Sequence, residues 1–417
     1  MKKRFLAALL CAASISLTTL GGCGCGGSGG GTVGGTDSGT STQNVNLVLW
    51  GAADDQAMLA DMVDAFKKAN TDKNYNIEIR VNGEDVARDE ALKDIDAAAD
   101  VFAIANDQLG ALVNADAVYE NTKYAQEIYD TRTESAIAAA KVGDKLYGYP
   151  SSSETYFLFY DKSKLTADEV TSLESILAKK QDSGVAPFAF DFGDAYFSSS
   201  FFLTAGCQIY GADGQDPTTV TFNTDEGAAA ARYIASLKAR GAEDMDGDVA
   251  GSRFAAGKLA SYVSGNWKVE AYTESLGDNL GVAKLPTINI AGEDRNMQSF
   301  AGGKMYVVKS TTKFPAEAMA LASFLTSEEN QLKRFNERQL LPNNVNLSEH
   351  EDILSQEATA AQVAQFEYSI PTPSITQMSK YWDPVGAFTQ DCYDGKISDS
   401  TIPDRLNTLV SDITAQG

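Results

Sequence analysis

Residues 45–50 (VNLVLW), 75–81 (YNIEIRV) and 100–105 (DVFAIA) are three short apolar runs near the start of the chain. Their length is typical of strands, and the second run alternates between apolar and polar residues. After the first run, apolar residues recur at helical spacing over residues 58–66, and an alanine-rich segment after the second run predicts another helix. This β-α-β-α-β series predicts an α/β fold with a mostly parallel sheet covered by helices. Ligands of such sheets bind beyond the carboxyl ends of the strands.

Polar and aromatic side chains follow the predicted strands where a ligand is expected. They are Trp50, Asp54 and Asp55 after the first run, Asn106, Asp107 and Gln108 after the third, Asp194 and Tyr196 after a strand at 188–192, and Asn266 and Trp267 after a strand at 259–263. Asp54 and Asp55 are also placed to cap the helix that follows them. Carboxylate and amide oxygens accept hydrogen bonds from hydroxyls, while an aromatic ring stacks on the C–H face of a sugar. Phosphate ligands would instead require arginine or a glycine-rich loop. The pattern therefore favours a neutral polyol.

Length and charge limit the possible classes of protein. The chain has 417 residues, more than a single hydrophobic core usually organises, so two globular units are expected. Lys and Arg number 34 against 57 Asp and Glu, which gives a formal net charge of -23. A surface of that sign repels nucleic acids and anionic lipid headgroups, so nucleic acid is not expected as a partner. The chain has one histidine, His350, which excludes His-rich metal sites. Because its sequence neighbours are acidic, His350 is interpreted as part of a solvated surface.

The first residues have the features of an export signal. A basic start at residues 2–4 precedes an apolar run over residues 5–20 that is too short to span a bilayer permanently. The run ends in Leu-Gly-Gly-Cys, which resembles the bacterial lipobox, so we expect residues 1–22 to be removed and Cys23 to be lipidated; an ordinary signal peptide with a chance cysteine is the alternative. Residues 23–44 are nearly all Gly, Ser and Thr and predict a flexible tether. The protein is therefore expected at the outer face of the cytoplasmic membrane, held there by its lipid.

Two further motifs leave alternatives open. Cys207 and Cys392 are the cysteines of the predicted folded part, and they can form a disulfide or remain two buried thiols. The stretch DMDGD at residues 244–248 begins like a calcium loop, but the loop lacks Gly at its sixth position and Glu at its twelfth. A solvated acidic turn is the favoured interpretation, and no metal or cofactor is expected.

Several motifs resemble the extracellular solute-binding proteins of sugar ABC importers, most closely their maltose- and maltodextrin-binding branch. The most specific is FAAGKLASYVSGNW at residues 254–267, which is similar to the F-x-x-G-x-x-A-M-x-x-x-G-x-W stretch of these receptors. Supporting motifs are residues 100–110, GDKLYGYP at 143–150 followed by Glu154 and by FYDK at 159–162, and QMSKYW at 377–382. The resemblance covers nearly all of the chain after the tether. It implies a two-lobed periplasmic-binding-protein fold that binds maltose or a malto-oligosaccharide in a cleft between the lobes.

The resemblance also implies roles for individual residues. These are hydroxyl acceptors at Asp107 and at Asp54 or Asp55 in the first lobe, an acceptor at Glu154 beside the crossing between lobes, a carboxylate and a ring at Asp194 and Tyr196 in the second lobe, and stacking platforms at Trp267 and Trp382 with Tyr381. Two positions depart from the maltose-binding branch. Gln108 stands where that branch has arginine, and Ile104 replaces an aromatic residue.

In this family the chain crosses between lobes more than once. The resemblance places lobe 1 at residues 45–152 and 303–353, and lobe 2 at residues 153–302 and 354–417. It implies a monomer that closes around its ligand by a hinge motion and presents the closed state to the permease subunits of an ABC importer, without any chemical reaction. The alternatives are an extracellular glycoside hydrolase, because paired carboxylates beside aromatic rings also describe those active sites, and a receptor for a different oligosaccharide.

Overall fold

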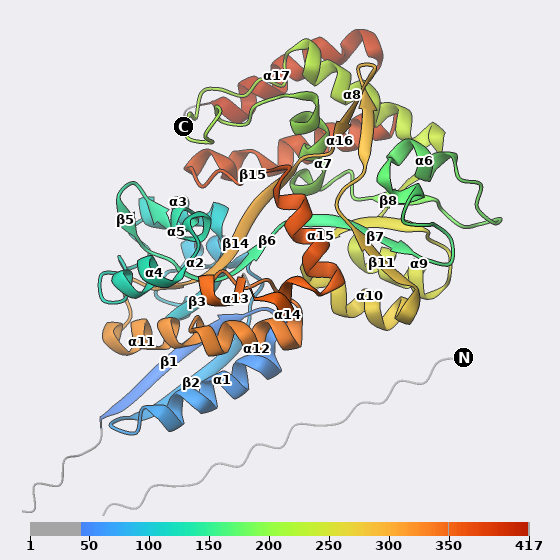
Figure 1. Ribbon diagram of the computed structural model, residues 1–417. Coiled ribbons are helices and arrows are strands. Elements are labelled where there is room, and N and C mark those ends of the chain that lie inside the picture. Colours follow the sequence, from blue (N-terminus) through green and yellow to red (C-terminus); the bar gives the residue numbers. More distant parts are fainter. Residues whose placement is uncertain (1–42, 349, 416–417) are drawn as a thin grey trace, which may run out of the picture. The chain divides into compact units, whose positions relative to one another are not determined.

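The computed structural model describes residues 43–348 and 350–415. The predicted signal peptide (1–22), the predicted lipidation site Cys23 and the predicted tether up to residue 42 lie outside these residues. Within the described ranges, no helix has both the length and the apolar character that crossing a membrane requires. The described chain builds two main sheets with helices packed on them (Figure 1). We call the first sheet with its helices lobe 1, and the second sheet with its helices lobe 2.

The three predicted strands at the start of the chain form the centre and one edge of the first sheet. Its strand order is β15-β14-β3-β1-β2, with β6 paired to β14. These strands are β1 (Asn44–Gly51), β2 (Asn74–Val81), β3 (Val101–Ala105), β6 (Tyr149–Glu154), β14 (Ser299–Val308) and β15 (Ser369–Pro371). β1 runs parallel to β2 and β3, as predicted, whereas β14 runs antiparallel to β3 and β6. The carboxyl ends of β1, β2 and β3 therefore lie at the same edge of the sheet.

Helices pack on both faces of the first sheet (Figure 1). They are α1 (Gln56–Ala69), α2 (Ala87–Lys93), α3 (Leu109–Asn114), α4 (Ala125–Thr131), α5 (Glu134–Ala139), α11 (Pro315–Leu325) and α12 (Glu328–Arg338). The apolar stripe predicted over residues 58–66 is the buried face of α1. The alanine-rich helix α2 ends at Lys93, because Asp94 is extended and a turn follows it.

The second sheet is mixed, which differs from the mostly parallel sheet that the sequence predicts. Its order is β11-β7-β10-β8-β9. The strands are β7 (Tyr156–Asp161), β8 (Phe188–Phe190), β9 (Ala242–Asp244), β10 (Ser261–Gly265) and β11 (Leu280–Ala283). β8 runs parallel to β9 and β10, but β7 runs antiparallel to β10 and β11. Parallel neighbours need a crossover connection, whereas β7 enters directly from β6 of the first sheet.

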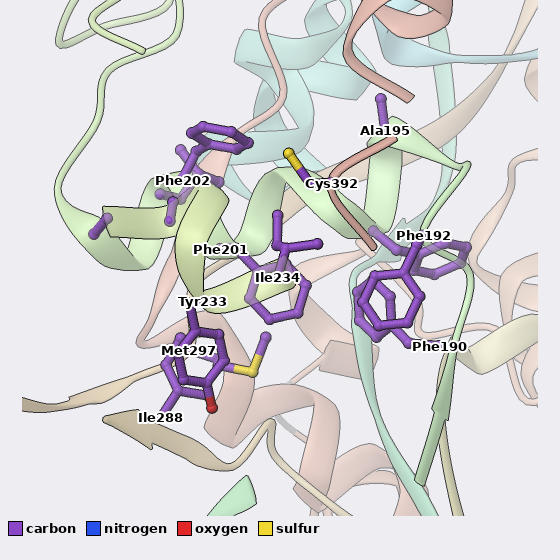
Figure 2. Packing of buried hydrophobic residues seen from close by; sticks show 14 of the residues in the cluster. Phe190, Phe192, Ala195, Phe201, Phe202, Tyr233, Ile234, Ile288, Met297 and Cys392 are labelled. Atoms are coloured by element: carbon purple, nitrogen blue, oxygen red, sulfur yellow. The ribbon is translucent and has the colours of Figure 1, made fainter. Parts of the chain in front are cut away.

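Phenylalanine dominates the larger core of lobe 2. On one face of the second sheet lie α7 (Ala195–Ala205), α8 (Asp225–Leu237), α16 (Trp382–Tyr393) and α17 (Ile402–Thr414). Figure 2 shows Phe190 and Phe192 meeting the buried residues of α7 and α8 in this core, among them Phe201. The rings of Phe192 and Phe201 are stacked with their centroids 6.2 Å apart. This core fixes α7, whose N-cap residue and first turn carry two of the predicted binding residues.

The opposite face and the margins of lobe 2 are covered by shorter elements. These are α6 (Leu173–Ala178), α9 (Gly247–Ala255), α10 (Val269–Leu276), α14 (Glu351–Leu354) and α15 (Glu357–Phe366), with the hairpin of β12 (Thr287–Ile290) and β13 (Glu293–Asn296). The short helix α13 (Val345–Ser348) packs against α12 of lobe 1, where Leu347 and Phe335 share a small buried cluster. A second small hairpin, β4 (Lys141–Val142) with β5 (Lys145–Leu146), belongs to lobe 1. A separate buried cluster on the second sheet contains residues of α9, α10 and α15, so both faces of that sheet are covered.

The chain passes between the two sheets through adjacent segments. Thr155, the one residue between β6 and β7, is fully buried, and its hydroxyl bonds to the Ser299 hydroxyl (2.8 Å) and the Phe300 carbonyl (2.6 Å) of β14. These bonds hold two crossing segments side by side. The pairing of β6 with β14 shifts register between Lys304 and Met305, which adds twist at that point. The boundaries given above for the two lobes along the chain remain a prediction.

Candidate functional site

A cavity of about 450 Å³ lies where the strand ends of the two sheets meet. Its size is in the range of small-molecule sites. Lobe 1 contributes Glu84, Asp85, Ala105, Asn106, Asp107, Gln108, Glu154 and Lys304, lobe 2 contributes Asp194, Tyr196, Phe197, Trp267 and Trp382, and Thr372 follows β15. The lining therefore combines five carboxylates with four aromatic rings and one ammonium group.

Asp107 and Trp382 meet across the cavity. Asp107 lies in the short 3₁₀ turn that follows β3, and Trp382 is the first residue of α16. The indole Nε1 of Trp382 donates a hydrogen bond to Asp107 Oδ2 at 3.2 Å. Burial raises the pKa of Asp107, against the opposing effects of the Arg88 charge and the Trp382 hydrogen bond. One carboxylate oxygen of Asp107 thus accepts a hydrogen bond from lobe 2.

Glu154 lies at the end of β6, directly before the crossing into lobe 2. Its side chain is buried, and no hydrogen bond to its Oε2 is found among the described residues. Burial raises the pKa of Glu154 to about 7, with Glu84 and Asp107 acting in the same direction and Lys304 opposing them. A buried carboxylate oxygen without a partner is costly. Because Glu154 lines the cavity, a ligand hydroxyl can supply the missing hydrogen bond.

Asp194 and Tyr196 lie at the start of α7. The Asp194 side chain caps the helix by accepting a hydrogen bond from the Tyr196 backbone N–H at 2.8 Å. This loop packs closely on α16, because a Cβ at Gly386 would lie 2.1 Å from the Gly193 carbonyl oxygen. Only glycine permits that approach. The contact sets the position of Asp194 relative to Trp382 at the start of the same helix α16.

The aromatic rings form a cluster on the lobe 2 side of the cavity. The Tyr196 ring lies 6.2 Å from Trp267 and 6.4 Å from Trp382, measured between centroids. Its hydroxyl is buried, and no hydrogen bond to it is found within the described chain. Trp267 follows β10, and a Cβ at Gly265 would lie 2.0 Å from its ring, so one side of the indole rests on the Gly265 backbone. The half-buried rings of Trp267 and Trp382 have the character of stacking platforms.

Three predicted binding residues, Asp54, Asp55 and Tyr381, lie outside the cavity lining, and their contact with a ligand stays a prediction. Asp55 is buried and pairs with Arg338 (Nε to Oδ1, 3.0 Å), while Asp54 is exposed and pairs with the same guanidinium (Nη2 to Oδ2, 3.3 Å). Neither side chain caps α1. Their pairing with α12 could not be predicted, because Arg338 is distant in sequence. Tyr381 is fully buried beneath Trp382, and its hydroxyl bonds to the Ser199 hydroxyl at 2.7 Å.

Gln108 lines the cavity but is largely occupied by protein contacts. Its amide nitrogen donates to the carbonyls of Glu84 and Asp85, and its Oε1 accepts from the Arg88 backbone N–H. Gln108 thus holds the loop between β2 and α2 against the cavity. Gln108 is the position at which the maltose-binding branch has arginine. Here a neutral side chain holds the backbone of Glu84 and Asp85, and both of these residues line the cavity.

Several lining residues are not among those that the sequence predicts. Glu84 and Asp85 follow β2, so the rule that located Asp107 after β3 would have found them had it been applied to the second strand. Lys304 and Thr372 carry no such signal. Lys304 lies inside β14, which reaches the cavity only because the chain returns from lobe 2, and Thr372 follows the short edge strand β15.

The other motifs of the sequence have structural roles. Asp246 caps α9 by accepting from two backbone N–H groups, and Asp248 pairs with Lys268. Over residues 43–348 and 350–415, no group of three or more His, Cys, Asp or Glu side chains is arranged to hold a metal ion. Cys207 and Cys392 are both buried and both free. His350 is exposed and caps α14, where its Nδ1 accepts from the Asp352 N–H.

Comparisons with known proteins extend these observations. A family model described as bacterial extracellular solute-binding protein matches residues 61–362. The chain is 30% identical over 374 residues to the galactooligosaccharide-binding protein of Bacillus subtilis (strain 168), an alignment that covers 86% of each chain. It is 25% identical over 300 residues to a maltooligosaccharide ABC transporter solute-binding lipoprotein of Streptococcus pneumoniae (strain ATCC BAA-255 / R6), covering 69% of this chain and 70% of that protein.

The structure is also similar to solved structures. The maltodextrin binding protein MalE1 from L. casei BL23 without ligand superimposes with a TM-score of 0.80 at 28% identity, covering 89% of this chain and 100% of that one. The predicted α/β fold with two lobes is therefore confirmed. The individual binding residues that the sequence predicts remain predictions.

Proposed function

The chain belongs to the bacterial extracellular solute-binding proteins, and from that premise we propose that its cavity captures a malto-oligosaccharide for delivery to an ABC importer. It is an oligosaccharide-binding protein of the sugar-importer type and not an enzyme, which removes the glycoside hydrolase alternative. The permease subunits of the importer are its proposed protein partners. The name of the relative from Streptococcus pneumoniae assigns that protein to an ABC transporter, which supports this proposal.

The observation that carries this proposal is the convergence of acceptor oxygens and flat rings from separate sheets on one cavity. Asp107 and Glu154 come from lobe 1, and Asp194, Trp267 and Trp382 come from lobe 2. Carboxylates accept from sugar hydroxyls while indole faces cover the apolar side of the sugar ring. A ligand that contacts both lobes has a higher affinity for the closed arrangement, so its binding favours hinge closure.

The charge of the cavity bears on the class of sugar. Five carboxylates and one lysine line it, so an anionic saccharide would meet repulsion. A neutral oligosaccharide has no such penalty. Galacto-oligosaccharides are a second candidate, because the relative from Bacillus subtilis that binds them covers 86% of this chain. The two sugar classes differ in the orientation of a ring hydroxyl and in linkage.

A thermal-shift panel tests the proposal. Maltose, maltotriose, maltotetraose, galactobiose and galactotriose are each added to the purified protein, with digalacturonate as the anionic control. A saccharide at one hundred times its Kd stabilises the folded state by about 2.7 kcal/mol, and we expect malto-oligosaccharides to do so. A larger shift with galactotriose would select the second candidate. An unchanged melting temperature with every neutral saccharide would contradict both.

Cys23 is the proposed lipid attachment site, and the outer face of the cytoplasmic membrane is the proposed location. The lipobox-like sequence before Cys23 supports this placement. We expect Cys23→Ser to release the protein from the membrane fraction into the medium, because stable anchoring requires the acyl chains. Fractionation with immunoblotting measures the change. Cys25→Ser, two residues further along, is the matched control and should stay with the membrane; retention of Cys23→Ser as well would exclude the anchor.

A further inference from the structure

Within the described part of the chain, Lys304 is the one cationic side chain that lines the cavity. Its side chain is 17% exposed, and its Nζ lies 3.5 Å from Glu84 Oε2 and 3.9 Å from Glu154 Oε2. Hydrogen bonds from an N–H group to an oxygen usually measure about 2.7–3.2 Å. The ammonium is therefore held by charge between two carboxylates, at distances longer than good hydrogen bonds. It retains the capacity to donate to a ligand.

The gap between Lys304 and Glu154 has the dimensions of a hydroxyl site. An oxygen atom about 2.8 Å from both Nζ and Oε2 fits between two atoms that are 3.9 Å apart. Glu154 Oε2 is buried and has no hydrogen bond within the described residues. A hydroxyl can accept from the ammonium and donate to the carboxylate at the same time. A hydroxyl at this point would satisfy both groups.

Trp267 links this gap to the aromatic side of the cavity. The Lys304 ammonium lies 5.7 Å from the centroid of the Trp267 ring. The backbone of Gly265 lies against that ring, where a Cβ would come within 2.0 Å, so that side is closed to a ligand. A saccharide ring stacked on the cavity side of Trp267 therefore lies within reach of Lys304.

We propose that Lys304 is a specificity-determining residue, which together with Glu154 holds one hydroxyl group of a saccharide ring stacked on Trp267. This inference rests on the proposed function and extends it to a residue with no counterpart in the sequence motifs. Lys304 selects for a ring that carries a hydroxyl at this point, because an apolar group there would leave Lys304 and Glu154 without the hydrogen bonds that the hydroxyl supplies.

A purely structural role is the competing explanation. Burial by itself would lower the pKa of Lys304, but Glu84 and Glu154 outweigh that effect and keep it raised, so the lysine stays charged. Neutralising the buried Glu154 and the half-buried Glu84 would stabilise the fold whether or not a ligand binds. Such a role predicts a lower melting temperature for a Lys304 variant without a specific loss of affinity.

Isothermal titration of the purified protein with maltotriose, and in parallel with galactotriose, distinguishes the two roles. We expect Lys304→Met to weaken binding on the order of 10- to 100-fold, the loss that corresponds to a hydrogen bond from a charged donor. Lys304→Gln serves as a second variant if Lys304→Met does not fold, with a loss in the same direction. Lys284→Met is the matched control, because the Lys284 ammonium also lies over a ring, that of Tyr368, but outside the cavity.

The pH dependence of affinity tests the part that Glu154 plays in the inferred hydroxyl site, while the loss of affinity at a pH where Glu154 is ionised tests Lys304 itself. The charged groups around Glu154 are Lys304, Glu84 and Asp107, and Lys304 lowers the pKa of Glu154. Glu154 accepts the hydroxyl more strongly when it is ionised, so the affinity of the wild type should fall as the pH decreases through the Glu154 pKa of about 7. In Lys304→Met that pKa rises further, and the fall in affinity should begin at a higher pH.

The possible outcomes separate the inference from the function on which it rests. Wild-type protein that binds neither trisaccharide overturns the proposed function and the inference with it. Wild-type binding with an unchanged Kd and pH profile in Lys304→Met overturns the inference alone and leaves the function standing. A loss of affinity in the Lys304 variants but not in Lys284→Met supports the inference.

Discussion

Trp382→Ala weakens saccharide binding by about 1–3 kcal/mol, the cost of removing a large ring face that a ligand would bury. This corresponds to roughly a 5- to 150-fold increase in Kd. Trp382 also donates to Asp107 across the cavity, so its removal takes away a bond that joins the two lobes. Isothermal titration with the saccharide that gives the largest thermal shift measures the effect.

Trp50→Ala is the matched control for this experiment. Trp50 lies on β1, packs against Phe102 at a centroid distance of 5.8 Å, and does not line the cavity. Its replacement should lower stability and leave the Kd unchanged. If Trp382→Ala bound as tightly as the wild type, Trp382 would not be a stacking platform, and the lobe 2 side of the proposed site would have to be reassigned.

Phe201→Ala lowers the free energy of unfolding by about 3–5 kcal/mol, because a fully buried ring is lost and a cavity remains in its place. Phe201 stacks on Phe192 and contacts Phe190, and all three lie in the core shown in Figure 2. Urea denaturation followed by circular dichroism measures the change. Since Phe201 lies on α7 with Asp194 and Tyr196 at the start of the same helix, affinity should fall as well.

Tyr129→Ala provides the comparison for Phe201→Ala. Tyr129 is an aromatic residue of α4 that is 40% exposed, and substitutions at such surface positions usually change stability by no more than about 0.5 kcal/mol. An equal loss in both variants would show that the urea transition does not report on the core of lobe 2. A loss below about 1 kcal/mol in Phe201→Ala would mean that the core closes around the missing ring.

Most of lobe 1 could be predicted from local pattern. The runs at 45–50 and 75–81 form β1 and β2 with their ends shifted by at most one residue, because apolar alternation and flanking turns determine such strands. The polar residues after β3 line the cavity as expected, since parallel strands bring their carboxyl ends to one edge. Pattern was less reliable in lobe 2, where the strand predicted at 259–263 is observed at Ser261–Gly265.

What the sequence did not reveal depends on contacts between distant residues. No residue near Asp55 in the sequence indicates that Asp55 pairs with Arg338. Polar neighbours in the sequence likewise give no sign that the Tyr381 side chain is fully buried. Lys304 reaches the cavity because β14 pairs with both β3 and β6 after the chain has passed through lobe 2. Glu154 and Trp382 were located only through family resemblance, because neither follows a strand of the predicted parallel series.

The position of β14 beside β3 has a consequence for synthesis of the protein. A nascent chain that has emerged as far as β11 already holds most of lobe 2, yet one edge of β3 still lacks its neighbour. Exposed strand edges promote association between chains, and pairing of strands that are far apart in sequence is slow. Polypeptides terminated before Ser299 should therefore aggregate through lobe 1. A chain broken after Val308 would still contain every strand of the first sheet except β15, which lies at its edge.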